Sequence, residues 1–181
     1  MNFCPACGER LAHDAPVRCA SCGRSHWRNP KPCAGALVVD AQQLLLVRRA
    51  HDPWCGLWDI PGGFCAIGEH PVETAVREVR EETGLEIAVT GFLGVWLDEY
   101  EQPTAGEPPE TTLNLYYHAV PLGGVAVVTD PVEVAEVGWF PRDGLPAALA
   151  FPAHSRAVLD AWLEAERAGR TTTLLPDRPA R

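Results

Sequence analysis

The sequence predicts an α+β domain that follows a small cysteine-rich domain. Segments of strong β-propensity are interleaved with two segments of helical periodicity, a mixture typical of the α+β class. Four cysteines fall within the first 22 residues, and the chain of 181 residues is long enough for one sizeable core after them. We therefore expect a zinc ribbon over residues 1–32, the main domain over 33–168 and a mobile tail over 169–181.

Two short cysteine pairs predict a structural metal site near the N-terminus. Cys4 and Cys7, like Cys19 and Cys22, are separated by two residues, and each pair is followed by glycine. Paired knuckles of this kind bring four thiolates to one tetrahedral Zn²⁺, and four protein ligands leave no open position for catalysis. Disulfides are the alternative, but the cysteine count is odd, seven, and no apolar leader precedes the pairs. Zinc and a cytoplasmic location are favoured.

The main domain is expected to contain several strands and a closing helix. Segments 33–39 and 44–49 are predicted to form a hairpin. The other segments with strong β-propensity are 86–96, 111–120 and 136–140. Apolar residues at helical spacing between residues 154 and 168 predict a helix that packs on the core.

A further helix is predicted between Pro71 and Gly84, because proline suits the first turn and glycine the residue beyond the last. Glu78, Glu81 and Glu82 then crowd one turn of this helix, within an arc of about 100°. Like charges at i and i+4 destabilise an isolated helix by roughly 0.2–0.5 kcal/mol. A divalent cation would offset that cost, and carboxylate oxygens suit Mg²⁺ or Mn²⁺ rather than zinc.

The segment around this helix resembles the Nudix box. The match begins at Gly63, includes Glu69, and continues through the run REVREETGL from Arg77 to Leu85, all at the family's fixed spacing. A solvated acidic helix face is the alternative, but a charge run alone does not require the flanking glycines. The resemblance implies a mixed β-sheet sandwiched between α-helices. It also implies a pyrophosphohydrolase that uses Mg²⁺ or Mn²⁺ to split a nucleoside diphosphate linked to another group.

The resemblance assigns roles to individual residues of the box. Glu78 and Glu82 are implied to be the principal metal ligands. Glu81 would assist them, and the carbonyl oxygen of Gly62 is an expected further ligand. Arg77 would orient a carboxylate through a charge-assisted hydrogen bond.

Two acidic positions outside the helix are expected to support the same chemistry. Glu69 would support the loop before the helix. Hydrolysis of a diphosphate also needs a carboxylate that accepts the proton of the attacking water, and family members often draw it from a downstream loop. Glu133, six residues before Trp139, is the best match, with Glu136 second. Either could instead be a charge that flanks a strand.

The charge distribution favours a small-molecule substrate. Residues 1–32 carry five basic and two acidic side chains, and the whole chain has a net charge of −9, so the remainder carries −12. Such an acidic main domain argues against non-specific binding of nucleic acid, which depends on neutralising phosphates. No apolar segment suggests a membrane span. The zinc ribbon is expected to be structural, although contact with RNA or a partner remains an alternative.

The arrangement of a four-cysteine ribbon before a Nudix box is similar to that of Nudix enzymes acting on NADH, ADP-ribose or flavin dinucleotide. The SQPWPFP stretch of the NADH enzymes is absent, which argues against NADH specificity. An aromatic side chain can stack on a nucleobase. The candidates for this role are Trp54, Trp58, Phe64, Trp96 and Tyr100. Arg48 or Arg49, at the end of a predicted strand, is a candidate for gripping a phosphate, and we favour Arg48.

The sequence therefore predicts a Mg²⁺- or Mn²⁺-dependent hydrolase of a nucleoside diphosphate derivative. ADP-ribose is the first candidate substrate, followed by NADH, FAD or a nucleoside triphosphate. The alternatives are a non-catalytic nucleotide sensor and an enzyme directed at the RNA cap. Because related enzymes often form dimers, a homodimer is a further expectation from the resemblance.

Overall fold

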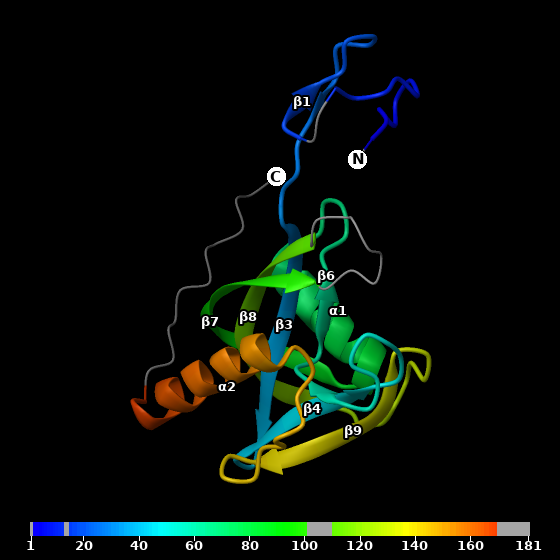
Figure 1. Ribbon diagram of the computed structural model, residues 1–181. Coiled ribbons are helices and arrows are strands. Elements are labelled where there is room, and N and C mark those ends of the chain that lie inside the picture. The colour runs from blue at the N-terminus through cyan, green and yellow to red at the C-terminus, as the bar shows by residue number, and fades with distance from the viewer. Residues whose placement is uncertain (1, 13–14, 101–109, 170–181) are drawn as a thin grey trace. The chain divides into compact units, whose positions relative to one another are not determined.

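The computed structural model describes residues 2–12, 15–100 and 110–169, apart from the side chain of Tyr100. The chain divides into two compact units, Met1–Pro30 and Lys31–Arg181. Figure 1 shows their elements. Most of the predicted mobile tail, residues 170–181, lies outside the described residues.

The smaller unit is built around a short hairpin and its cysteines. Strands β1 (Val17–Arg18) and β2 (Ser25–His26) pair antiparallel. Its few buried apolar side chains are Cys4, Leu11, Val17 and Cys19. A core of this size is too small to stabilise a fold without a metal or disulfides.

The described part of the larger unit contains a mixed seven-stranded sheet and two helices. In chain order its elements are β3 (Lys31–Asp40), β4 (Gln43–Arg49), β5 (Trp58–Asp59), β6 (Gly62–Phe64), α1 (Pro71–Thr83), β7 (Glu86–Tyr100), β8 (Glu110–Gly123), β9 (Val134–Pro141) and α2 (Pro152–Arg167). The main path through the sheet is β5-β4-β3-β8-β7, with β6 paired to β3 and β9 paired to β4. Strands β3 and β8 run parallel, and the other pairs are antiparallel.

The two helices cover opposite faces of β3 (Figure 1). Because successive side chains of a strand point to opposite faces, neighbouring residues of β3 pack against different helices. Ala36 and Val38 join the buried cluster that includes Val79 of α1. Leu37 lies between them in sequence and joins the cluster that includes Trp162 of α2. The predicted α+β class, with a mixed sheet between helices, is confirmed.

The segments with strong β-propensity form strands, and the structure adds two strands that the sequence did not predict. The hairpin of β3 and β4 turns through Ala41 and Gln42, both at positive φ, as the type I′ two-residue hairpin turn requires. The added strands, β5 and β6, have only two and three residues. They are too short to show a hydrophobic alternation, yet they place residues at the functional site.

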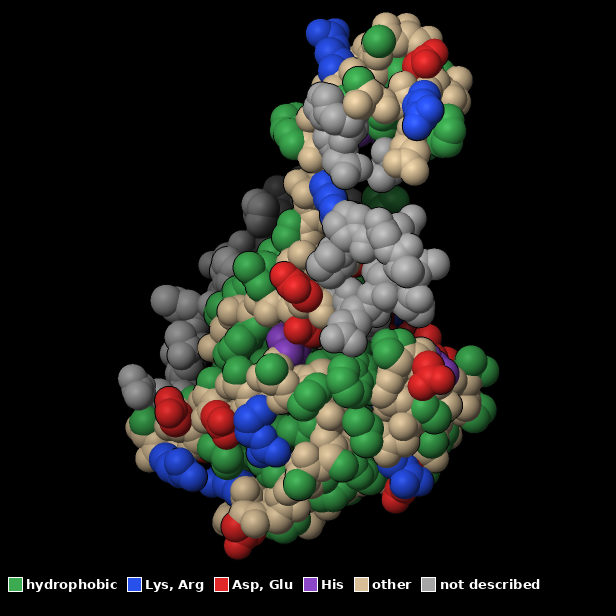
Figure 2. All heavy atoms as spheres, in the orientation of Figure 1, with side chains coloured by type: hydrophobic (Ala, Val, Ile, Leu, Met, Phe, Trp, Pro, Cys, Tyr) green, Lys and Arg blue, Asp and Glu red, His purple; other side chains and the backbone are tan. Residues whose placement is uncertain are grey.

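The described surface of the larger unit is mixed in character. On the face drawn in Figure 2, hydrophobic side chains lie between scattered acidic and basic ones. None of the helices described is both long enough and apolar enough to cross a membrane.

Candidate active site

Helix α1 is held at both ends by local contacts, which fix the face that it turns toward the loop before it. At its start, the His70 side chain accepts a hydrogen bond from the Val72 N–H, and the Glu73 carboxylate accepts one from the His70 N–H. At its end, Gly84 adopts the left-handed conformation with φ 70° and its N–H donates to the Arg80 carbonyl. These are a capping box and a glycine C-cap.

This orientation brings the predicted carboxylates together at one cavity, here called the carboxylate cavity. Its empty volume is about 990 Å³. The residues lining it are Arg49, His51, Gly62, Gly63, Phe64, Ala66, Arg77, Glu78, Glu81, Glu82, Asp130 and Glu133. Glu78 and Glu82 are nearly buried, at 8% and 7% exposure, whereas Glu81 is exposed.

The two glycines before the helix allow this close approach of carboxylates to backbone. The Gly62 N–H donates a hydrogen bond to Glu82 Oε2 at 3.1 Å. A Cβ at Gly63 would lie only 2.5 Å from Glu78 Oε1, and one at Gly62 would lie 2.6 Å from the Ala34 carbonyl oxygen. Side chains at either position would therefore push the carboxylates or the strand aside.

Arg77 connects three carboxylates of the motif. It forms a two-pronged contact with Glu69, from Nε to Oε1 at 2.7 Å and from Nη2 to Oε2 at 3.0 Å. Its Nη1 donates to both Glu78 and Glu81 at 2.8 Å. Glu69 also accepts from the Ala66 N–H and the Thr74 hydroxyl, so it ties the loop to the helix. The Arg77 hydrogen bond is the main reason that the pKa of Glu69 falls to about 2.

The electrostatics of the carboxylate cavity favour a cation. Burial, reinforced by the neighbouring Glu78 and Asp59, raises the pKa of Glu82 well above its ordinary value. Burial also raises the pKa of Glu78, although Arg77 opposes that shift. The predicted ligands are the carboxylate oxygens of Glu78 and Glu82, with those of Glu81 and Glu133 beside them. All of them are hard oxygen donors, and none is a sulfur or an imidazole nitrogen. Such a set fits Mg²⁺ or Mn²⁺.

Asp59 and Arg49 also face this region. Nothing in the sequence indicated that these two residues would lie together. Asp59 on β5 lies 3.7 Å from Arg49 at the end of β4. A smaller cavity is lined by both residues together with Glu82 and Glu133. Burial raises the pKa of Asp59 to about 7 against the opposing charge of Arg49. Only the pairing of β4 with β5 brings Asp59 here, and the sequence carries no local signal of that pairing.

The structure puts Arg49, and not the favoured candidate Arg48, at the carboxylate cavity. Arg48 forms an ion pair with Glu136 at 2.8 Å and lies over the Trp58 ring. Arg49, the other candidate, lines the carboxylate cavity. Successive residues of a strand point to opposite faces, so only one of the two could face the site.

The aromatic candidates are similarly divided. Phe64 lines the carboxylate cavity and is 48% exposed. Trp58 instead packs edge-on against Phe140, with ring centroids 4.7 Å apart, and does not line that cavity. Trp96 packs against Tyr116 inside the unit. Tyr100 ends β7, and its side chain lies outside the described part of the structure.

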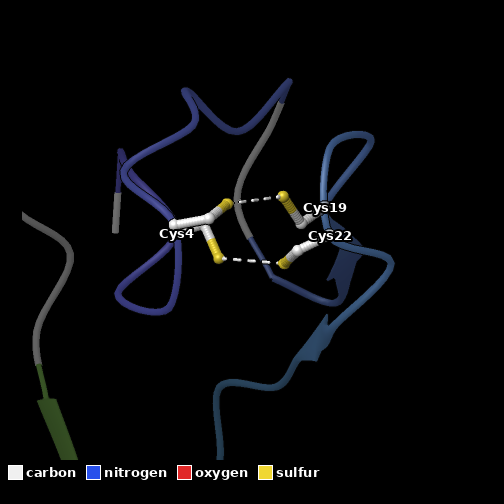
Figure 3. A group of neighbouring side chains, drawn as sticks. Cys4, Cys19 and Cys22 are labelled. Carbon is white, nitrogen blue, oxygen red and sulfur yellow. Dashed lines mark hydrogen bonds between the residues drawn. The ribbon is translucent and has the colours of Figure 1, made fainter.

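The four N-terminal cysteines form a second candidate site, in the smaller unit (Figure 3). Their sulfur atoms all lie within 4.8 Å of one another. Cys4 Sγ is 3.7 Å from Cys22 Sγ, and Cys7 Sγ is 3.6 Å from Cys19 Sγ. Tetrahedral zinc with Zn–S bonds of about 2.3 Å separates its sulfurs by about 3.8 Å. The cluster therefore fits a zinc ion.

Comparison with known proteins agrees with this geometry. The family model of the NUDIX domain matches residues 29–162. That match covers most of the chain, including α1 and the carboxylate cavity. The chain therefore belongs to the Nudix family.

Individual relatives extend the comparison. The chain is 30% identical over 178 residues to the NAD-capped RNA hydrolase NudC of Stutzerimonas stutzeri, covering 97% of this chain but 60% of that protein. It is 31% identical over 134 residues to the ADP-ribose pyrophosphatase of Methanocaldococcus jannaschii, covering 74% of each. A crystal structure of a NUDIX hydrolase from Nitrosomonas europaea superposes with a TM-score of 0.75 at 25% identity, covering 96% of this chain and 97% of that one.

Proposed function

We propose that this chain is a Mg²⁺- or Mn²⁺-dependent pyrophosphohydrolase of nucleoside diphosphate derivatives, with ADP-ribose as the first candidate substrate. The observation that carries the proposal is the convergence of Glu78, Glu81, Glu82 and Glu133 on one cavity. A cluster of acidic side chains with two members nearly buried is costly unless a cation is bound. A nucleotide sensor would not need such a cluster.

The residues of the carboxylate cavity have distinct roles in this proposal. Glu78 and Glu82 hold the metal, with Glu81 and the Gly62 carbonyl as further ligands. The bound metal would neutralise phosphate oxygens and lower the pKa of a bound water. Arg77 keeps Glu78 and Glu81 in position through the contacts of its Nη1.

Two residues outside the helix complete the chemistry. Glu133 lines the same cavities as Glu82, which supports a role for it as acceptor of the proton of the attacking water. Arg49 presents the cation that an anionic diphosphate requires. Its Nε donates to the Pro53 carbonyl at 2.9 Å, and Asp59 lies near its Nη1, so the guanidinium is oriented before substrate binds.

ADP-ribose as substrate draws support from the relative that is named an ADP-ribose pyrophosphatase. Hydrolysis of its diphosphate linkage would yield AMP and ribose 5-phosphate. NADH, FAD and nucleoside triphosphates remain lower-ranked candidates.

A second candidate is an NAD-capped RNA. The match to the NudC relative covers 97% of this chain and so extends into the cysteine-rich unit. That unit carries an exposed tryptophan, Trp27, at 68% exposure, which could stack on a base. The acidic balance of the rest of the chain and the absent SQPWPFP stretch count against this candidate.

The proposal is tested by incubating the purified protein with Mg²⁺ or Mn²⁺ and a panel of substrates. The panel contains ADP-ribose, NADH, FAD, nucleoside triphosphates and NAD-capped RNA, and the products are identified by mass spectrometry. ADP-ribose is expected to give the highest kcat/KM. A wild-type protein that binds these compounds but turns none of them over would favour the sensor.

A paired substitution tests the metal ligands. Glu82→Gln is expected to lower kcat by about 10²–10³-fold or more, the size of loss typical when one transition-state-stabilising group is removed. Glu164→Gln, on the exposed surface of α2, is the matched control. Full activity in Glu82→Gln, with the fold intact by circular dichroism, would rule out its role as a principal ligand.

A further inference from the structure

A second cavity, here called the aromatic cavity, adjoins the carboxylate cavity. Its empty volume, which includes the open solvent at its mouth, is about 550 Å³. The two cavities share Arg49, Gly62, Gly63 and Phe64. A ligand whose diphosphate lies on the shared residues would therefore extend into the aromatic cavity.

The walls of the aromatic cavity suit a flat ring. Phe64, Tyr116 and Phe151 contribute aromatic faces or edges from three separate parts of the larger unit. Tyr116 is buried, and its hydroxyl lies 3.0 Å from His154 Nε2, so its position is set from within. Phe64 is half exposed at the junction of the two cavities. Stacking on such faces holds a base but distinguishes poorly between bases.

The polar lining of the aromatic cavity includes two carboxylates, those of Asp59 and Asp98, beside hydroxyl, amide and imidazole groups that can donate as well as accept. Asp98 on β7 contributes a carboxylate. Asn114 on β8 donates from Nδ2 to Thr112 Oγ1 at 2.8 Å, and its side-chain oxygen remains as an acceptor. Among the described lining residues, Arg49 is the one permanent cation, and it lies at the junction with the carboxylate cavity.

The acceptor oxygens of Asp98 and Asn114 favour a ligand that presents N–H groups to them. Adenine and guanine each carry an exocyclic amino group. Hypoxanthine has the same purine ring and an N1–H, but it has a carbonyl at C6 and hydrogen at C2 and so lacks an exocyclic amino group. A carbonyl, or a bare C–H, opposite a carboxylate leaves that acceptor without a donor, and a site built for hydrogen bonding discriminates strongly against such a ligand.

We propose that the aromatic cavity binds the base of the substrate and that Asp98 and the side-chain oxygen of Asn114 select purines carrying an amino group over hypoxanthine. The inference rests on the proposed function for its phosphate half, because that function places the diphosphate at the shared residues. It adds the class of base and the residues that recognise it.

The test uses AMP, GMP and IMP, which contain no diphosphate linkage. Their binding to the full-length protein in Mg²⁺ is measured by isothermal titration calorimetry, so the result does not depend on turnover. AMP or GMP is expected to bind about 10- to 100-fold more tightly than IMP. The stronger of the two identifies the base. Equal affinity for all three, or no binding of AMP and GMP at millimolar concentration, would overturn the proposal.

Two variants locate the discrimination. Asp98→Asn keeps the shape of the side chain but replaces one acceptor oxygen with a donor, and it is expected to reduce the preference over IMP to within a few-fold. Asp160→Asn, on the exposed surface of α2, is the matched control and should keep the preference. If Asp98→Asn weakens all three ligands equally, or leaves their ratios unchanged, Asp98 does not read the base.

The two proposals fail in distinguishable ways. Selective binding of AMP or GMP with no hydrolysis of any panel substrate would refute the proposed reaction and keep the base site. Hydrolysis of the panel with no preference over IMP would do the reverse.

Discussion

Glu78 lies directly against the backbone of Gly63, and this contact explains a glycine that the motif places fifteen residues earlier. A Cβ there would lie 2.5 Å from Glu78 Oε1 and 2.6 Å from its carboxyl carbon, closer than non-bonded atoms approach. The carboxylate would have to move, and with it a proposed metal ligand.

Gly63→Ala is therefore expected to lower kcat/KM by about 100-fold, the loss typical when a reacting group is displaced by about 1 Å. Affinity for Mn²⁺, measured by electron paramagnetic resonance, should fall as well. Gly123→Ala is the control, because a Cβ at Gly123 would meet nothing within 4 Å. An active Gly63→Ala with normal Mn²⁺ affinity would contradict the role of this contact.

Glu69 makes the free energy of unfolding of the larger unit depend on pH in the acidic range. Its pKa is lowered from 4.5 to about 2, chiefly by the hydrogen bond from Arg77. Because the folded-state pKa lies below the unfolded one, the ionised group stabilises the fold above pH about 4.5. That contribution is lost as the pH falls toward 2.

The difference in unfolding free energy between wild type and Glu69→Gln should be constant above pH about 5 and shrink below it. Urea unfolding at a series of pH values measures this difference, and Glu164→Gln controls for the loss of one acidic side chain. A difference that persists unchanged to pH 2.5 would show that Glu69 does not stabilise the fold through its charge.

Helix α1 could be predicted almost completely because its signals are local. The first-turn proline, the glycine beyond the last turn and the helical period together predicted its span, and the structure begins it at Pro71 and ends it at Thr83. The same period predicted that three glutamates share one face. The role of His70 in the capping box was not predicted, because histidine is not among the usual N-cap residues.

The C-cap of α1 provides a stability test. Gly84 has φ 70°, and a Cβ there would lie 3.1 Å from Thr129 Cγ2. Gly84→Ala should lower the free energy of unfolding by about 1–2 kcal/mol, the cost of a left-handed conformation for a residue with a Cβ. Gly84→Asn should cost less, since asparagine tolerates this conformation better. Equal losses in the two variants, measured by urea unfolding, would point to the Thr129 contact instead.

The strands were predictable to different degrees. Those of seven or more residues carry enough β-propensity to be recognised, although β7 continues to Tyr100, beyond the predicted residue 96. Strands β5 and β6 carry no such signal. Their conformation depends on hydrogen bonds to β4 and β3, which are contacts between segments distant in sequence.

The whole chain combines two units with different sources of stability. The larger unit buries two hydrophobic clusters on the two faces of its sheet. Among its described residues, the smaller unit buries four apolar side chains, two of them cysteines of the sulfur cluster. We propose that a structural zinc ion replaces the missing core in the smaller unit.

Metal removal separates these contributions. The purified protein is expected to contain one zinc per chain by mass spectrometry, and a strong chelator should unfold residues 2–30 while the main thermal transition of the larger unit persists. Cys22→Ser should produce the same pattern without a chelator. Absence of zinc, or a smaller unit that keeps its NMR signals after chelation, would refute the zinc proposal.

The sequence by itself determined the α+β class, the four-cysteine site and the acidic face of α1. All three follow from short-range spacing, because a helix period or a cysteine knuckle spans only a few residues. Only the tertiary structure decided that Arg49 and not Arg48 faces the carboxylates, and that Asp59, Asp98 and Asn114 line the neighbouring cavities. Those placements depend on how strands pair and which face each residue takes, and a shift of one residue in register reverses the face.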